Sequence, residues 1–161
     1  LEFEPECVLK MLIAQKDVTC TPYRVKTNDP TSTKYTVSIE NPKNVKILQG
    51  GLVEINNGPA GMMLIKRNVF EKMIKDYPEK EIKVNPNEGS FPKDMRIYNF
   101  WDCNFKDGVW KGEDIYFCDL ARKSGFNIFA NIDSTLIHHG SFGYKGKYGD
   151  SFKPKANGKT N

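Results

Sequence analysis

The stretch "GEDIYFCDLARKSG" (residues 112–125) predicts an amphipathic helix that begins with two acids and ends before a glycine. Helical neighbours recur every three or four positions, so Phe117, Cys118 and Ala121 share one stripe with Asp114. Three of these four residues are typical of a core, whereas Asp114 is a carboxylate at the edge of the apolar face. Asp114 is therefore either a group that stabilises the start of the helix or a working acid.

The segments on both sides of this helix predict strands and a second helix. After it come two apolar runs, "FNIFANI" (126–132) and "STLI" (134–137), which we read as strands. Before it, a turn-rich opening leads into the strand "MMLI" (62–65) and then into a helix. The apolar face of that helix consists of Val69, Phe70, Met73, Ile74 and Tyr77.

The N-terminal part predicts one more helix and several short strands. The helix lies within "EPECVLKMLIAQ" (4–15), and its expected buried face is Val8, Leu9, Leu12 and Ile13. The expected extended and turn segments are strands at 17–24 and 34–40, a hairpin or bent strand at 45–55 around Gly50 and Gly51, a loop at 84–94 and an extended aromatic stretch at 95–105. Mixed helices and strands of this kind predict an α/β or α+β sheet sandwich.

Composition restricts the class of protein. With 161 residues, 39% hydrophobic and 27% charged, the chain suits one globular domain, which we place at 1–150, followed by a flexible basic tail at 151–161. We expect no membrane span, no leader peptide and a cytoplasmic location, because no apolar run approaches about 20 residues. The net charge of +4 is dispersed, which argues against a nucleic-acid partner.

The cysteines and histidines predict no zinc centre. Cys7, Cys20, Cys103 and Cys118 form no CxxC pair, and the only two histidines are adjacent, at His138 and His139. We expect reduced thiols that are mostly buried.

Three segments, in this order, resemble the C-terminal half of a GT-A fold glycosyltransferase. They are "NGPAGMMLIKRNVFEKM" (57–73), "GVWKGEDIYFCDLARKSGFNIF" (108–129) and "IDSTLIHHGSFGYKG" (132–146). They are similar to the family's small-residue loop with its strand and helix, its acid-pair helix and its late strand that ends in His-x-Gly. The resemblance implies a GT-A-like mixed sheet flanked by helices, and an enzyme that transfers a sugar from a nucleotide-sugar donor to an acceptor hydroxyl.

The N-terminal segment adds an expectation about the part of the protein that precedes it in sequence. "LEFEPECVLKML" (1–12) is similar to the segment that directly follows the family's metal-binding Asp-x-Asp turn, and no Asp-x-Asp occurs in these 161 residues. The chain also opens with Leu1 instead of methionine. We therefore expect a partial, truncated domain that represents the acceptor side, with the donor-binding half upstream.

The resemblance gives the acid pair a catalytic role. In inverting members of the family, the second acid of the pair is the general base that removes the proton of the acceptor hydroxyl, which implies Asp114 here, with Glu113 as a supporting acid on acceptor hydroxyls. The first helical turn suits this role, because unpaired backbone N–H groups and the helix dipole keep a carboxylate ionised. The simpler alternative is that both acids only stabilise the helix start. A retaining enzyme could also keep the same acids.

His138 occupies the family's His-x-Gly position, which implies a ligand for a divalent cation, Mn²⁺ or Mg²⁺, on the donor diphosphate. Imidazole suits manganese better than magnesium. The alternative is a histidine with an ordinary structural role. His139 would point the other way if this stretch is extended.

The remaining candidates are substrate contacts. The small-residue loop of Gly58, Pro59, Ala60 and Gly61 would let a sugar approach the backbone, and Trp101 and Trp110 could stack on a sugar ring. Tyr144 and Lys145, in a mobile C-terminal flap, could reach a diphosphate. A tight turn, core packing and an ordinary loop are the respective alternatives.

The sequence therefore supports two main functional interpretations. The first is a glycosyltransferase that uses a nucleotide-sugar donor, a divalent cation and a carbohydrate or glycosylated acceptor. The second is a non-catalytic carbohydrate-binding module that lacks the donor site. A protein that serves only as a structural or interaction partner is a third possibility.

Overall fold

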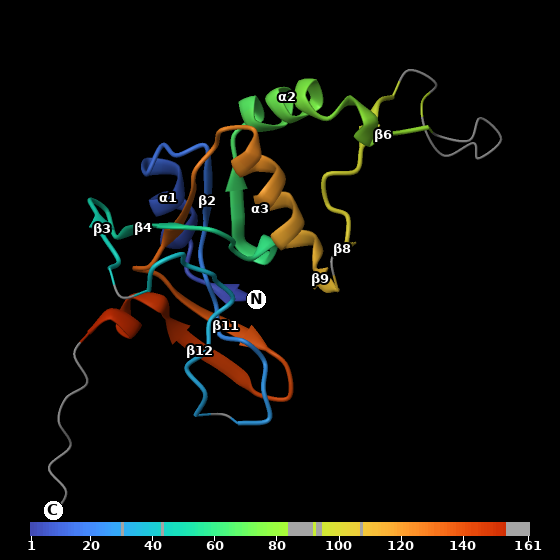
Figure 1. The fold of residues 1–161 in the computed structure, drawn as a ribbon. Coiled ribbons are helices and arrows are strands. Elements are labelled where there is room, and N and C mark those ends of the chain that lie inside the picture. Colours follow the sequence, from blue (N-terminus) through green and yellow to red (C-terminus); the bar gives the residue numbers. More distant parts are fainter. Residues whose placement is uncertain (30, 43, 84–91, 93–94, 107, 154–161) are drawn as a thin grey trace, which may run out of the picture.

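The computed structural model describes residues 1–29, 31–42, 44–83, 92, 95–106 and 108–153. Its centre is a five-stranded sheet in the order β3-β4-β10-β2-β5 (Figure 1). The five strands are β2 (Val18–Cys20), β3 (Ile47–Leu48), β4 (Leu52–Ile55), β5 (Met63–Ile65) and β10 (Ile128–Asn131). β10 runs parallel to β2, and the other neighbours pair antiparallel. The sheet is thus mixed, and the prediction of a mixed α/β architecture is confirmed.

Helices cover both faces of this sheet. α2 (Arg67–Asp76) and α3 (Glu113–Lys123) pack on the face formed by Val18, Cys20 and Ile128, whereas α1 (Glu6–Ile13) packs on the other face. Figure 1 shows α1 and α3 on different sides of β2. The larger core therefore lies between the sheet and the two later helices.

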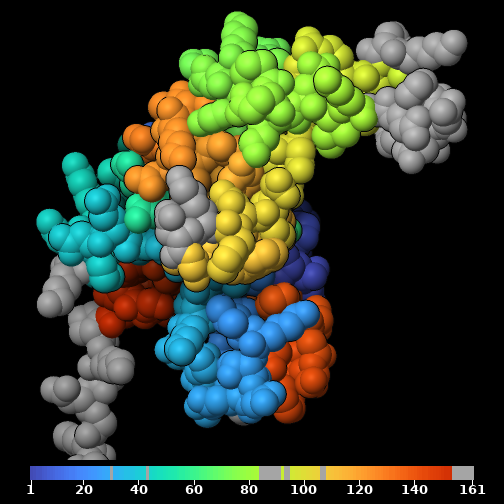
Figure 2. Space-filling model, turned by 45° about the vertical axis from the view of Figure 1, so that its right-hand side comes forward, coloured from blue at the N-terminus to red at the C-terminus, as the bar shows by residue number. Residues whose placement is uncertain are grey.

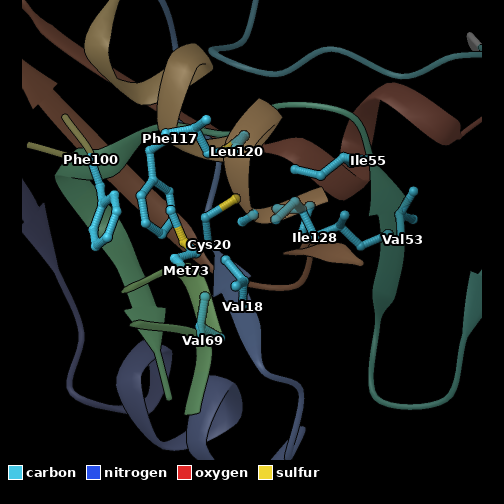
Figure 3. Packing of buried hydrophobic residues seen from close by; sticks show 14 of the residues in the cluster. Val18, Cys20, Val53, Ile55, Val69, Met73, Phe100, Phe117, Leu120 and Ile128 are labelled. Atoms are coloured by element: carbon cyan, nitrogen blue, oxygen red, sulfur yellow. The ribbon is translucent and has the colours of Figure 1, made fainter. Parts of the chain in front are cut away.

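The sequence of α3 explains both its ends and its buried face. Gly112 is extended before the helix, two acids occupy the first turn, and Gly125 ends the helix with a φ of 91° that glycine adopts without strain. Phe117, Cys118 and Ala121 are each 0% exposed, which confirms the predicted stripe. Figure 3 shows Phe117 facing Met73, Cys20 and Phe100 in this core.

The predicted strand and helix at 62–77 are confirmed as well. The 3-10 helix η1 (Ala60–Met62) leads into β5, and α2 follows after one residue. Val69 and Met73 are fully buried, and Phe70, Ile74 and Tyr77 pack beside them. The hairpin at 45–55 is confirmed too, because β3 and β4 are joined through Gly50 and Gly51, which have φ of 78° and 68°.

The predicted buried face of α1 is wrong. Leu9, Leu12 and Ile13 are 54%, 46% and 79% exposed, while Cys7 and Met11 are each 2% exposed. The buried pair faces a polar group directly after β2, because Thr21 contacts the sulfur atoms of Cys7 at 3.3 Å and Met11 at 3.5 Å. The pattern of apolar residues alone would predict that the opposite side of this helix is buried.

The predicted strand at 34–40 is also wrong. Within it the structure has only two isolated pairs, Arg24 with Tyr35 and Ser38 with Asn57. This segment instead lines a cavity together with the start of α3, and Tyr35 donates to the carbonyl oxygen of Lys147 in the second sheet. Of the predicted loop at 84–94, residues 84–91 and 93–94 lie outside the described residues.

A second sheet carries the histidines. It consists of β1 (Glu2–Phe3), β11 (Thr135–His139) and β12 (Gly143–Lys147) in the order β1-β11-β12. The predicted mobile flap is thus largely strand β12, paired with β11 along five residues of each strand. Figure 2 shows the β11–β12 hairpin beside the blue segment that follows β2.

Short elements complete the described chain. They are η2 (Pro78–Lys80), the pair β6 (Glu81–Ile82) and β7 (Ile97–Tyr98), the pair β8 (Asn104–Lys106) and β9 (Val109–Lys111), and η3 (Tyr148–Phe152). Phe152 still packs on the core, and the expected tail lies outside the described residues from 154 onward. None of the described helices is long and apolar enough to cross a membrane.

Candidate functional site

Asp114 lies in the first turn of α3 and lines a cavity of about 250 Å³. Its Oδ1 accepts a hydrogen bond of 2.8 Å from the backbone N–H of Ile115, and the residue is half-buried. The other residues that line the cavity are Thr36, Val37, Ser38, Asn57, Gly58 and Ile115. Asp114 thus shares this hollow with Gly58 of the small-residue turn.

The small-residue turn packs tightly between β2 and α3. A Cβ atom on Gly58 would lie 2.2 Å from Sγ of Cys20, so no larger residue fits there without a shift. The thiol of Cys118 donates to the carbonyl oxygen of Gly58 at 3.8 Å. Gly58 and Pro59 are buried, Ala60 is half-buried and Gly61 is exposed. The turn therefore has a packing role at Gly58, and its exposed end at Gly61 lies against Tyr23.

Tyr23 contacts both the end of the small-residue turn and the imidazole of His138. Its ring meets His138 edge-on, with centroids 4.6 Å apart, and a Cβ atom on Gly61 would lie 2.6 Å from its hydroxyl oxygen. Burial, followed by the charge of Asp114, raises the pKa of Tyr23, while the backbone N–H of Gly61 acts in the opposite sense. The phenol is therefore protonated at neutral pH and can donate a hydrogen bond.

His138 is oriented by the residue that follows Tyr23. Its Nδ1 lies 2.9 Å from the carbonyl oxygen of Arg24, so Nδ1 carries the proton and Nε2 keeps its lone pair. Histidines that bind metals are usually held in this way. His139, on the same strand, instead places Nε2 2.8 Å from Glu2, as expected for alternating side chains in an extended strand.

A metal site is not complete among the residues that the structure describes. No group of three His, Cys, Asp or Glu side chains that could hold an ion occurs among them. His138 is therefore a single potential ligand in this part of the chain.

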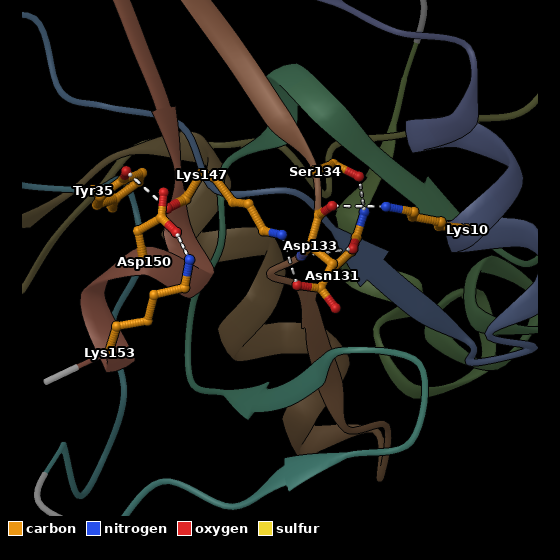
Figure 4. A network of polar contacts seen from close by, with 8 residues as sticks. All are labelled: Lys10, Tyr35, Asn131, Asp133, Ser134, Lys147, Asp150 and Lys153. Atoms are coloured by element: carbon orange, nitrogen blue, oxygen red, sulfur yellow. Dashed lines mark hydrogen bonds and ion pairs between the residues drawn. The ribbon is translucent and has the colours of Figure 1, made fainter.

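A polar network fixes the start of β11, the strand that carries His138. Lys10 donates to the carbonyl oxygen of Asp133 at 2.7 Å, and Lys147 pairs with the Asp133 carboxylate at 3.1 Å (Figure 4). Asn131 donates to Ser134 at 2.8 Å across the same turn. Helix α1, the β10–β11 turn and the end of β12 are tied together by these contacts.

Three other candidates are not among the residues that line the cavity beside Asp114. Trp101 stacks on Phe117, with ring centroids 4.2 Å apart, so it packs on the core with 36% of its surface exposed. Trp110 is 66% exposed on β9. Lys145 lines a different hollow, together with Glu2 and Phe3.

The expected reach of Tyr144 toward a diphosphate is not supported. Its side chain is 5% exposed, and its hydroxyl donates to the carbonyl oxygen of Thr27 at 2.6 Å. Pairing of β12 with β11 turns this residue inward. Glu113, by contrast, is exposed at the start of α3.

Sequence reasoning missed Tyr23 and Thr36. The hydroxyl of Thr36 donates to the carbonyl oxygen of Tyr23 at 3.0 Å and accepts from its N–H at 3.2 Å, which ties the backbone of Tyr23 to the segment that lines the cavity. The segment "TPYRVK" (21–26) has no pattern that marks its tyrosine, because its neighbours come from distant parts of the chain.

Comparisons with known proteins add no family. Protein-family models, curated proteins and solved structures were each searched, and none matches this chain.

Proposed function

We propose that this chain is the acceptor-side and catalytic-base part of a GT-A-like glycosyltransferase, which transfers a sugar from a nucleotide-sugar donor to an acceptor hydroxyl. The observation that carries the proposal is that Asp114 and Gly58 line one cavity, while Tyr23 contacts both Gly61, at the other end of the same turn, and His138. The resemblance names the acid, the turn and the imidazole together, and they come from three separate segments.

In the proposed reaction, the acceptor hydroxyl lies in the cavity with its proton toward Asp114. The acceptor oxygen attacks the anomeric carbon and forms the new glycosidic bond, while the bond from that carbon to the phosphate oxygen breaks. The electron pair of the broken bond leaves with the nucleoside diphosphate, and the proton goes to the carboxylate. Attack from the side opposite the leaving group inverts the anomeric configuration.

The size of the cavity supports an acceptor better than a whole donor. A volume of about 250 Å³ is below the roughly 300–1,000 Å³ of pockets that enclose drug-sized ligands. It suits one small unit such as a monosaccharide. Glu113, exposed beside Asp114, is proposed to bind further acceptor hydroxyls.

A divalent cation, Mn²⁺ or Mg²⁺, belongs to the proposal only as a partner of the donor diphosphate. His138 would offer Nε2 to it, because Nδ1 already binds the Arg24 carbonyl. The described residues do not complete a cation site, so no step of the proposed mechanism passes through the metal.

A non-catalytic carbohydrate-binding module is the second candidate. It is favoured by one specific observation, namely that the 161 residues contain no Asp-x-Asp to hold a donor diphosphate through a cation. Such a module would keep the cavity beside Asp114 and bind saccharides without turning over a donor.

A turnover assay separates the two candidates. The complete gene product, with whatever precedes Leu1, would be incubated with a panel of UDP- and GDP-sugars, Mn²⁺ and methyl glycosides, and nucleoside diphosphate release would be measured. We expect release with at least one donor and an inverted anomeric configuration in the product by NMR. Saccharide binding without any release would favour the module, and neither binding nor release would remove both candidates.

A further inference from the structure

We propose that Asn57 selects the acceptor, with its side-chain amide donating a hydrogen bond to a saccharide hydroxyl in the cavity beside Asp114. This inference rests on the proposed function and adds to it a residue that determines acceptor specificity.

The first support is position. Asn57 lines the same cavity as Asp114, and it directly precedes Gly58, which lines that cavity too. The cavity is small, at about 250 Å³, so an occupant of the size of a monosaccharide touches several of its walls. An acceptor that fills this cavity therefore contacts Asn57 as well as Asp114.

The second support is a fixed backbone. The N–H of Ser38 donates to the carbonyl oxygen of Asn57 at 3.0 Å, and the N–H of Asn57 donates to the carbonyl oxygen of Ser38 at 3.4 Å. The next residue, Gly58, packs against Cys20 and accepts from the thiol of Cys118. Because Asn57 is held on both sides, little of its backbone freedom is lost when a ligand binds.

The third support is an unused amide. In the part of the chain that the structure describes, no hydrogen bond involves the side chain of Asn57, and its Oδ1 is buried without a partner. Nδ2 is not among these buried atoms, so it is accessible. An unpaired buried acceptor lowers stability, and such a group calls for an explanation other than folding. The hydroxyl of Thr36, in the same cavity, is by contrast bonded to the backbone of Tyr23.

The fourth support is chemical complementarity. The carboxylate of Asp114 only accepts hydrogen bonds, whereas Nδ2 of Asn57 carries two N–H donors. The two side chains together suit two hydroxyls of one sugar, in which one hydroxyl gives its proton to Asp114 and the other accepts from Nδ2. A site that hydrogen-bonds a substrate hydroxyl discriminates against analogues that lack it. Asn57 would therefore select acceptors by a hydroxyl other than the reacting one.

The test uses the complete gene product and the variant Asn57→Leu, which removes the amide at similar size. With methyl glycosides of glucose, galactose, mannose or N-acetylglucosamine as acceptors, we expect the KM for the acceptor to rise about 3- to 10-fold, the range for one hydrogen bond. The kcat at saturating acceptor should change less. The matched control is Asn56→Leu, the same change one residue earlier, in a different hollow, which should leave the KM unchanged.

Two further measurements separate binding from a structural role. Because the amide has no partner in the described protein, Asn57→Leu should keep or raise thermal stability, whereas a structural amide would lower it. Monodeoxy methyl glycosides identify the contacted hydroxyl, since the rise in KM caused by Asn57→Leu should disappear for the one analogue that lacks it.

Each outcome decides the role of Asn57. A wild-type KM in folded Asn57→Leu would overturn this role and leave the proposed function standing, and so would an equal rise in KM for every monodeoxy glycoside. Asn57→Ala, with its smaller side chain, gives the same readings where the leucine variant does not fold. No turnover by the wild-type protein would remove the proposed function and this inference with it.

Discussion

The phenol ring of Tyr23 meets the imidazole of His138 edge-on, with centroids 4.6 Å apart, although 115 residues separate the two in the sequence. The contact joins the segment after β2 to strand β11. The carbonyl oxygen of Arg24 binds Nδ1 of the same imidazole, so two consecutive residues hold one ring. This arrangement leaves Nε2 with its lone pair and predicts which nitrogen carries the proton.

The tautomer of His138 can be measured directly. We expect the Nδ1–H form at pH 8, because Nδ1 must donate to the Arg24 carbonyl. Two-bond ¹H–¹⁵N correlation spectra distinguish the two tautomers, and a His139→Gln variant assigns the signals. An Nε2–H form at position 138 would mean that the contact to Arg24 is absent in solution.

The orientation of α1 predicts opposite results for neighbouring residues. Met11 is 2% exposed and Leu12 is 46% exposed. Met11→Ala should lower the free energy of unfolding by about 2–5 kcal/mol, whereas Leu12→Ala should change it by less than about 1 kcal/mol. Urea unfolding followed by circular dichroism measures both values. Equal losses would show that the helix is rotated from the orientation described.

Close packing of the small-residue turn predicts a coupled pair. Gly58→Ala would place a Cβ atom 2.2 Å from Sγ of Cys20 and should cost about 1–3 kcal/mol of stability. Removing that sulfur with Cys20→Ala should recover part of the loss in the double variant. Strictly additive effects of the two substitutions would rule out the contact.

The buried thiol of Cys118 predicts a loss of stability at alkaline pH. Burial is the largest cause that raises its pKa from 9.0 to about 11. An unfolded chain loses this proton near pH 9 while the folded protein retains it, so stability is complete below pH 9 and falls as pH rises toward 11. A shift of two pKa units corresponds to about 2–3 kcal/mol.

Urea unfolding at pH 8, 9, 10 and 11 measures this decline. Cys118→Ala removes the thiol and should give a shallower decline than the wild-type protein. The remainder comes from other groups whose pKa values burial also raises, namely Cys20, Tyr23, Tyr35 and Tyr148. An identical decline in Cys118→Ala would contradict the assignment to this thiol.

Part of the fold could be predicted because local patterns and tertiary packing agree there. In α3, the residues with helical spacing are also those that contact the sheet, and Gly125 ends the helix as glycine usually does. In α1 the local apolar pattern and the tertiary packing disagree. Its buried side faces Thr21 and Asn131, so a cysteine and a methionine pack there while leucines remain exposed.

The candidate site was predicted only where a motif marked it. Asp114 and Gly58 belong to the segments that carry the resemblance, and they line one cavity. Tyr144 was misjudged because pairing of β12 with β11 is a long-range property that composition does not show. Tyr23 was missed for the same reason, since its neighbours come from four other segments.

The central claim is that Asp114 takes the proton of an acceptor hydroxyl. Its most direct test is the rate of sugar transfer by the complete gene product carrying Asp114→Asn, which keeps the size of the side chain and its ability to accept from Ile115. Asp17→Asn is the control, because Asp17 pairs with Lys66 on the surface. We predict that transfer falls about 100-fold or more in Asp114→Asn, at unchanged thermal stability, and stays at the wild-type rate in Asp17→Asn. Wild-type transfer by a folded Asp114→Asn protein would contradict the claim.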